Sequence, residues 1–119
     1  METNRKKALR ESYKNYRPEM GVFGIRHRDS RKIYLMATNN LKGKMNSVMF
    51  QLKNHSFVTC RALNEAFKQE GEAAFEAEVL EKLDYDKDDE AGQKDYSQEL
   101  ELMKDLWRDK LLAQGFEVY

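Results

Sequence analysis

Cationic side chains, which can bind phosphate groups, are concentrated in the first half of this chain. Residues 1–61 contain 14 Lys or Arg and 4 Asp or Glu, a formal charge of +10, whereas residues 62–119 contain 7 and 17, a charge of −10. If these halves segregate in the fold, the basic half attracts phosphates and the acidic half repels them. A compact fold that interleaves them has a neutral surface instead. The candidate nucleic-acid-binding residues are Arg26, Lys32, Lys42 and Lys44.

Carboxylates, histidines and cysteine are the other side chains that could do chemistry. His27 and His55 are isolated, so we expect surface or hydrogen-bonded histidines rather than catalytic bases. Cys60 is the only cysteine, which excludes an internal disulfide and a cysteine pair for zinc or redox chemistry. We therefore expect no metal site and no cofactor from these residues.

The composition is that of one soluble domain. The chain has 119 residues, of which 40% are hydrophobic and 35% charged, and this length can bury one core without a metal or a disulfide. It has neither an apolar run of about 18 residues that could span a membrane nor the apolar centre of a signal peptide. We expect a cytoplasmic protein with no membrane partner.

A β-hairpin is predicted near the N-terminus. Residues 20–27 and 32–39 have the composition of strands, and the Arg-Asp-Ser-Arg sequence at 28–31 is typical of the turn between them. With the turn centred between Asp29 and Ser30, Ile25 pairs with Tyr34 and Phe23 pairs with Met36. Because side chains alternate along a strand, one face of the hairpin carries Phe23, Ile25, His27, Lys32, Tyr34 and Met36.

Helical periodicity appears in three segments after the hairpin. Residues 41–52 place apolar side chains at i, i+4, i+7, i+8 and i+11, the pattern of a core-facing helix, with Asn39 or Asn40 as its N-cap. A second helix, from about residue 59 to residue 70, ends at Gly71. A third runs from a cap at Ser97 through Gln114. Its inner stripe is Leu100, Met103, Leu106, Trp107 and Leu111.

The remaining segments complete the order of elements. Residues 74–80 alternate apolar side chains with glutamates and predict a third strand, whereas the acidic run 84–95 predicts an exposed loop. Residues 4–16 predict a short basic amphipathic helix ended by Pro18, so we divide the chain into a basic helix, 1–18, and a domain, 19–119. The order is α-β-β-α-α-β-α. The fold class is α+β, with a small three-stranded antiparallel sheet flanked by helices.

Two motifs in this order resemble the GIY-YIG nuclease family. From Tyr34, the sequence YLMATNNLKGK is similar to the family's YIG strand, the start of its first helix and the basic residue ten places after the tyrosine. Further on, LNEAFKQEGEAAFEAEVLEKL is similar to the family's second helix, Gly-Glu turn and third strand. The resemblance covers residues 20 to about 113 and implies the same fold.

The resemblance also implies four catalytic positions, most of them substituted here. Tyr34 keeps the family's second tyrosine, but Phe23 lacks the hydroxyl of the first. Lys44 keeps the charge of the helix arginine without its bidentate fork. Lys104, three residues before Trp107, stands where the family has its metal-binding glutamate, and a lysine cannot bind Mg²⁺, which takes oxygen ligands. Glu101 and Asp105 lie within a turn of Lys104 and are weak candidates for a shifted metal ligand.

Three functions are compatible with this pattern. The first is a non-catalytic nucleic-acid-binding protein with a nuclease-like fold, which engages the backbone of DNA or RNA. The second is an active metal-dependent endonuclease with a rearranged site, which would need Mg²⁺. The third is a protein-interaction or self-associating module whose basic and acidic halves pair between subunits as a homo-oligomer. We rank them in this order.

Overall fold

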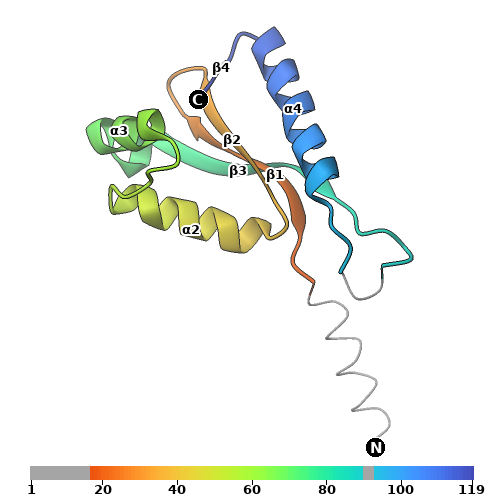
Figure 1. Cartoon of the computed structure of the whole chain (residues 1–119). Coiled ribbons are helices and arrows are strands. Elements are labelled where there is room, and N and C mark those ends of the chain that lie inside the picture. Colours follow the sequence, from red (N-terminus) through yellow and green to blue (C-terminus); the bar gives the residue numbers. More distant parts are fainter. Residues whose placement is uncertain (1–16, 90–92) are drawn as a thin grey trace, which may run out of the picture.

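The computed structural model describes residues 17–89 and 93–119, and its elements follow the predicted order (Figure 1). The basic helix predicted at 4–16 lies outside the described residues, so the division of the chain at residue 18 stays a prediction. The described elements are β1 (Met20–His27), β2 (Lys32–Thr38), α2 (Leu41–Lys53), α3 (Arg61–Glu70), the 3-10 turn η1 (Glu72–Ala74), β3 (Phe75–Leu83), α4 (Ser97–Ala113) and β4 (Glu117–Val118).

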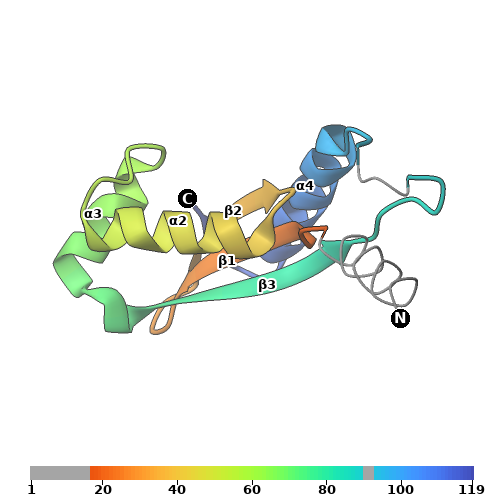
Figure 2. The same cartoon turned by 90° about the horizontal axis from the view of Figure 1, so that it is seen from below.

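β1 is a central strand of the sheet. The strand order is β3-β1-β2-β4, and β1 is antiparallel to both of its neighbours. The predicted pairs Ile25 with Tyr34 and Phe23 with Met36 are confirmed. Figure 2 shows β3 along an outer edge of the sheet. The three-stranded antiparallel sheet is therefore present, and the two-residue β4, which pairs parallel to β2, extends it to four strands.

Helices cover both faces of this sheet, with α2 and α3 on one side and α4 on the other (Figure 1). Phe23 and Ile25 point toward α2 and α3, and both are completely buried. Val22, the neighbour of Phe23 on β1, is equally buried but packs on the α4 side. The alternation of side chains along β1 thus supplies two cores from one strand.

A β-bulge corrects the predicted pattern of β3. Val22 pairs with Glu81 and Phe23 with Val79, so Leu80 is an extra residue without a partner on β1. Leu80 packs with the α4 cluster, and Glu81 accepts a hydrogen bond from the indole N–H of Trp107 at 2.8 Å. Val79, which the strict alternation placed inward, is 41% exposed.

The inner face of α4 is narrower than predicted. Leu100 and Leu111 are buried and Trp107 is partly buried, but Leu106 is 61% exposed, so its place on the inner stripe was wrong. Leu106 lies five residues before Leu111, about 140° away around the helix axis. Ser97 is the first residue of the helix rather than its cap. Its backbone N–H donates to Asp95 Oδ1 at 2.9 Å.

Within the described residues, no helix is long and apolar enough to cross a membrane.

Two glycines provide a matched test of this packing. A Cβ on Gly21 would lie 2.0 Å from the carbonyl oxygen of Glu81, in the backbone of β3, whereas a Cβ on Gly71 would meet nothing within 4 Å. Gly71 carries only the cost of its positive φ of 85°. We expect Gly21→Ala to lower the free energy of unfolding by about 3 kcal/mol, the upper end for overpacking, and Gly71→Ala by about 1 kcal/mol. Urea denaturation measures both, and equal losses would contradict the close approach of β1 to β3.

Candidate nucleic-acid interface

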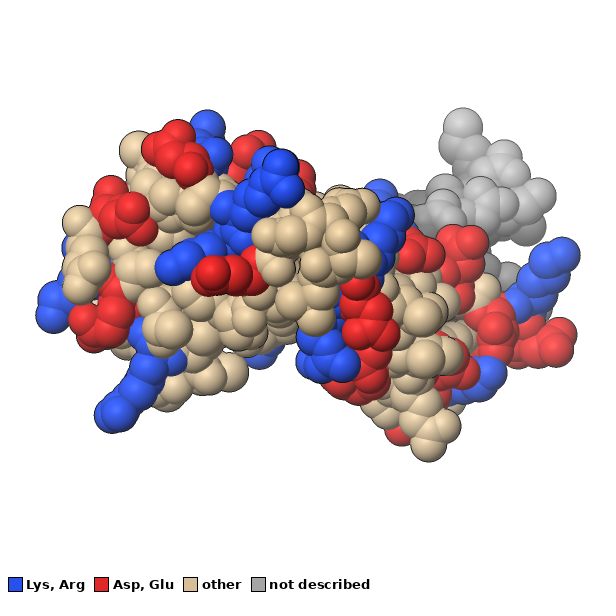
Figure 3. Space-filling view, turned by 90° about the horizontal axis from the view of Figure 1, so that it is seen from above, with Lys and Arg blue, Asp and Glu red and all other residues tan. Residues whose placement is uncertain are grey.

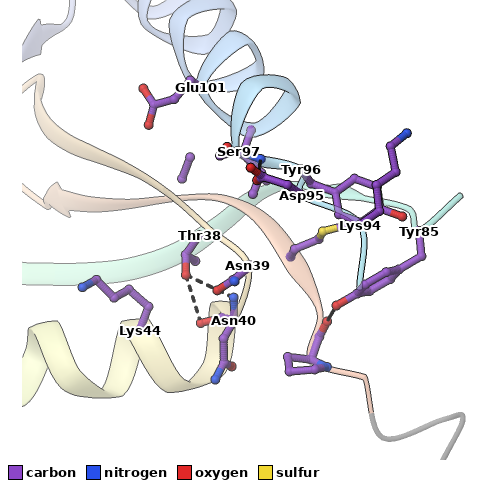
Figure 4. Close-up of a pocket in the computed structure, with 14 residues that line it drawn as sticks. Thr38, Asn39, Asn40, Lys44, Tyr85, Lys94, Asp95, Tyr96, Ser97 and Glu101 are labelled. Carbon is purple, nitrogen blue, oxygen red and sulfur yellow. Dashed lines mark hydrogen bonds between the residues drawn. The ribbon is translucent and has the colours of Figure 1, made fainter. Parts of the chain in front are cut away.

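A pocket of about 640 Å³ lies where α2 and α4 begin. Thr38 and Asn40, at the end of β2, contribute to its lining together with Lys44 of α2 and Glu101 of α4 (Figure 4). The first turns of both helices border the pocket, and the unpaired N–H groups of a helix N-terminus carry partial positive charge. The pocket therefore combines donors, one free ammonium group and carboxylates.

The start of α2 is held by its N-cap, which is Asn40 and not Asn39. Asn40 Oδ1 accepts a hydrogen bond from the Gly43 N–H at 3.1 Å, and the Asn40 N–H donates to Thr38 Oγ1 at 3.1 Å. A side chain on Gly43 would bring its Cβ within 2.6 Å of Asn40 Nδ2, so this cap depends on the glycine. The cap fixes the direction in which the first turn presents Lys44.

Tyr96 anchors the opposite wall and directly follows the acidic run 84–95, which was predicted to be an exposed loop. Most of the described residues of that run are exposed, whereas Tyr96 is 6% exposed and packs with Met20 and Leu100. Its hydroxyl donates to Asp89 Oδ2 at 2.8 Å and accepts from the Asp86 N–H at 3.0 Å.

Tyr85 fastens the same wall to the start of β1. Its hydroxyl donates to the carbonyl oxygen of Pro18 at 2.7 Å, and its ring meets that of Tyr96 edge-on, with 5.5 Å between centroids. The Arg17 guanidinium lies 4.7 Å from the Tyr85 ring centroid. Cation–π and aromatic contacts of this kind are worth about 1 kcal/mol each. The wall is thus a built structure and not a solvated run of acidic residues.

The carboxylate of Asp89 accepts hydrogen bonds from three residues of this loop and its anchor, Gln93, Lys94 and Tyr96. Desolvation alone would raise the pKa of Asp89, but hydrogen bonds from the Tyr96 hydroxyl and from the backbone amides of Gln93 and Lys94, with the charge of Arg17, lower it. Because the pKa is lowered in the fold, the stabilisation is present above the ordinary value of 3.8 and is lost as the pH falls through the lowered value.

The two hairpin positions implied by the family resemblance do not line the pocket. Phe23 is 0% exposed, inside the core beneath α2 and α3. Tyr34 is partly buried, and its ring packs edge-on against Phe57 with 5.6 Å between centroids. Burial, and to a smaller extent the nearby Cys60 thiol, raises the pKa of Tyr34 above its ordinary value, so its hydroxyl stays protonated at neutral pH.

The two helix positions implied by the resemblance, Lys44 and Lys104, are both connected with Glu101. Lys44 and Glu101 line the same pocket, and Lys104 Nζ lies 3.2 Å from Glu101 Oε2. Asp105, the other weak metal candidate, pairs with Arg108 at 3.7 Å. Among residues 17–89 and 93–119, no group of three His, Cys, Asp or Glu side chains could hold a metal ion. Of the carboxylates that line the pocket, that of Glu101 is paired with a lysine.

The four candidate phosphate-binding residues fall into two separate places. Lys42 and Lys44 are exposed on the first turns of α2, and neither forms an ion pair in the described part of the chain. At the hairpin end, Arg26 lies 5.6 Å from the ring centroid of Phe116, and Lys32 is 3.9 Å from a Glu117 carboxylate oxygen. The length of β2, about 20 Å, separates the two places, so the four residues do not form one patch.

The charge pattern explains why Lys42 and Lys44, at the start of α2, have no carboxylate partner among the described residues. Residues 30–64 contain six Lys or Arg and no Asp or Glu, and α2 lies within this range. Elsewhere, acidic and basic side chains are interspersed, as on the face in Figure 3. Lys94, a pocket residue that the sequence analysis did not identify, is typical, because it pairs with Asp86 and this contact raises the pKa of Lys94.

Residues that the sequence analysis missed build most of the pocket. Thr38 and Ser97 are ordinary helix-start residues, and only the meeting of two helix starts gives them a role. For Tyr85 and Tyr96 a signal was present, because two tyrosines within an acidic, apolar-poor run have no reason to be there unless they pack.

The arrangement of a hairpin, two helices, a third strand and a long helix over the opposite face is a GIY-YIG-like fold. Two solved structures of the catalytic domain of the intron-encoded homing endonuclease I-TevI, one of them a mutant, are similar to this chain. Both have a TM-score of 0.60 and 18% sequence identity. They cover 78% and 77% of this chain and 84% and 87% of their own. Neither a protein-family model nor a curated protein sequence matches the chain.

Neighbouring aspartates test the anchored loop. We expect Asp89→Asn to weaken the wall of the pocket, because an amide replaces the carboxylate that accepts bonds from Tyr96, Gln93 and Lys94. Amide hydrogen exchange at Asp86 and Lys94 should become faster at neutral pH. The control is Asp88→Asn, since Asp88 forms no hydrogen bond or ion pair within residues 17–89 and 93–119.

The same opening should occur in the wild-type protein in acid, once the pH falls through the lowered pKa of Asp89. Limited pepsin digestion in acid can detect it. Protection of the loop that is unchanged in Asp89→Asn, or equally reduced in both variants, would contradict the role given to this carboxylate.

Proposed function

We propose that this protein, which has a nuclease-like fold, binds the phosphate backbone of DNA or RNA without cleaving it. The observation that carries the proposal is the pair of exposed, unpaired lysines, Lys42 and Lys44, at the start of α2. Most other cations of the described part of the chain have a carboxylate or an aromatic ring as a partner. An unneutralised ammonium group beside a helix N-terminus attracts phosphate.

The same side chains make weak, sequence-independent binding the expected behaviour. Ammonium groups act on phosphates as point charges and carry no base-reading geometry. The segment from residue 30 to residue 64 has no carboxylate to oppose them. A double helix or a single strand that approached α2 would therefore meet only positive charge from this segment.

Catalysis is unsupported at three of the four family positions, each for a physical reason. Phe23 has no hydroxyl and no access to solvent. Tyr34 is packed against Phe57, away from the pocket that holds Lys44. Lys104 forms an ion pair with the carboxylate of Glu101, and its positive charge repels a cation. These residues do not fit a magnesium ion, so we assign no catalytic step to one.

A metal-dependent endonuclease with a rearranged site is the second candidate, and Glu101 is the observation that favours it. Glu101 lines the pocket opposite Lys44, as a shifted metal ligand would. A magnesium ion is often held by one or two carboxylates together with substrate phosphates. This candidate requires Lys104 to leave Glu101, which costs the ion pair seen at 3.2 Å.

Removal of the α2 lysines tests the binding proposal. For duplex DNA, we expect log Kobs to fall linearly with log salt. The magnitude of the slope should decrease by about 0.9 for each phosphate that Lys42→Ala or Lys44→Ala leaves without its lysine. Fluorescence anisotropy over a salt series measures both quantities. Lys68→Ala is the matched control, because Lys68 is an exposed, unpaired lysine of α3 within the described residues. Binding that ignores salt, or that weakens as much with the control, would count against the proposal.

Plasmid nicking separates the two candidates. We expect no cleavage by the wild-type protein with Mg²⁺ or Mn²⁺. The combined change Lys44→Arg and Lys104→Glu should yield at most faint nicking, because Phe23 still lacks the first tyrosine's hydroxyl, and groups that act in one transition state give little when only some are restored. Robust metal-dependent cleavage by the unmodified protein, abolished by Glu101→Gln or Tyr34→Phe, would establish the endonuclease instead.

A further inference from the structure

The outward face of α2 carries an exposed aromatic side chain that the core does not use. Phe50 is 69% exposed, while Leu41, Val48 and Leu52 turn inward on the same helix. At 100° per residue, Phe50 points almost opposite to the centre of the buried stripe. Single exposed apolar residues are common and need no explanation, so the surroundings of Phe50 have to decide what it does.

The surroundings of Phe50 are cationic and polar. Lys42 and Lys44 lie on opposite sides of Phe50, about 80° and about 120° away around the helix axis. Lys53 follows one turn after Phe50 and is paired with Glu72 at 3.0 Å. Asn46 lies four residues before Phe50, adjacent to it on the helix surface, and has no hydrogen-bond partner in the described part of the chain. α2 itself contains no acidic residue.

Exposed leucines on α4 show that this combination is specific to α2. Leu102 and Leu106 are 60% and 61% exposed, close to the value for Phe50. Their neighbours on that helix include Asp105 and Asp109, which would repel a phosphate backbone. Comparable apolar exposure therefore occurs on both helices, but of the two only α2 has no carboxylate of its own.

We propose that Phe50 is a stacking platform for an unpaired base, and that the outward face of α2 binds single-stranded nucleic acid. This inference rests on the proposed function and narrows its ligand to strands with accessible bases. Lys42 and Lys44 hold phosphates, Phe50 offers its ring to a base, and Asn46 can hydrogen-bond the edge of that base. Stacking of a base on an aromatic ring tolerates any sequence, because every base has a π-face.

The end of α2 supports a fixed platform. The Asn54 backbone N–H and Nδ2 both donate to the carbonyl oxygen of Phe50, at 3.1 and 2.8 Å, and they close the last turn under the ring. On one side of Phe50, Gln51 Nε2 donates to Ser47 Oγ at 3.2 Å. The backbone that carries Phe50 is therefore held by its own helix, and little ordering is required when a strand binds.

The test compares strands with and without bases. We expect Phe50→Ala to weaken binding of a short oligothymidylate by about tenfold, within the range for loss of one base stack, and to leave binding of an abasic strand of equal length unchanged. The salt slope should stay at its wild-type value, because both lysines still neutralise their phosphates. Phe50→Tyr and Phe50→Trp should bind as the wild type does. Val58→Ala, at an apolar residue 83% exposed outside the helix, is the control and should have no effect.

Three other outcomes would each overturn the proposal that Phe50 stacks on a base. Phe50→Ala that binds oligothymidylate like the wild type, or that binds the abasic strand more weakly by the same factor, overturns the platform while leaving backbone binding by Lys42 and Lys44 intact. A protein that binds neither duplex nor single strand contradicts both proposals. If Phe50→Ala instead abolishes self-association in sedimentation, with no change in oligothymidylate binding, the face is an interface between copies and the inference fails.

Discussion

The double burial of β1 is the constraint on which the rest of the molecule depends. This strand is paired along both edges and covered on both faces, and Val22, Phe23 and Ile25 are completely buried. A fully buried side chain of this size contributes about 1.5–3 kcal/mol through removal of its apolar surface from water. The helices α2 and α3 pack on one face of β1, and α4 packs on the other. This common strand fixes the start of α2 relative to the start of α4. The pocket between the first turns of α2 and α4 is a consequence of that packing.

The same burial limits the chemistry at Phe23. A hydroxyl at that position would be enclosed by apolar side chains and would lack solvent access, and an unsatisfied buried hydroxyl is costly. A phenylalanine there favours a stable core. The binding surface that we propose lies instead on helix positions that are exposed to solvent. The lysines at 42 and 44 meet that condition, and so does the exposed ring at 50.

Strand alternation and helical periodicity were sufficient to predict most of the fold. They located β1 and β2, their register and the faces of α2, because the turn at 28–31 fixes which residues of a hairpin pair. They could not predict the bulge at Leu80, where an extra residue switches the side that β3 presents. The strand β4 is too short to show a period. Charge composition concealed the packing of Tyr85 and Tyr96, whose partners are distant in sequence.

The candidate site was predictable only in its local parts. The cap at Asn40 and the Glu101–Lys104 pair, three residues apart, follow from spacing along one helix. The separation of Arg26 and Lys32 from the α2 lysines, and the meeting of Lys44 with Glu101, depend on how the helices sit on the sheet. Sequence composition gives a set of cations but not which of them find carboxylate partners.

The central claim, that α2 presents unneutralised charge to nucleic acid, can be tested residue by residue with NMR. Backbone amide shifts would be followed while a short single-stranded oligonucleotide is added to the protein. We expect the perturbed amides to be those of the Asn40 cap and of α2 from Lys42 to Phe50, with little change at the hairpin end near Arg26 and Lys32. Perturbation confined to the hairpin end, or an unchanged spectrum at saturating oligonucleotide, would contradict the account.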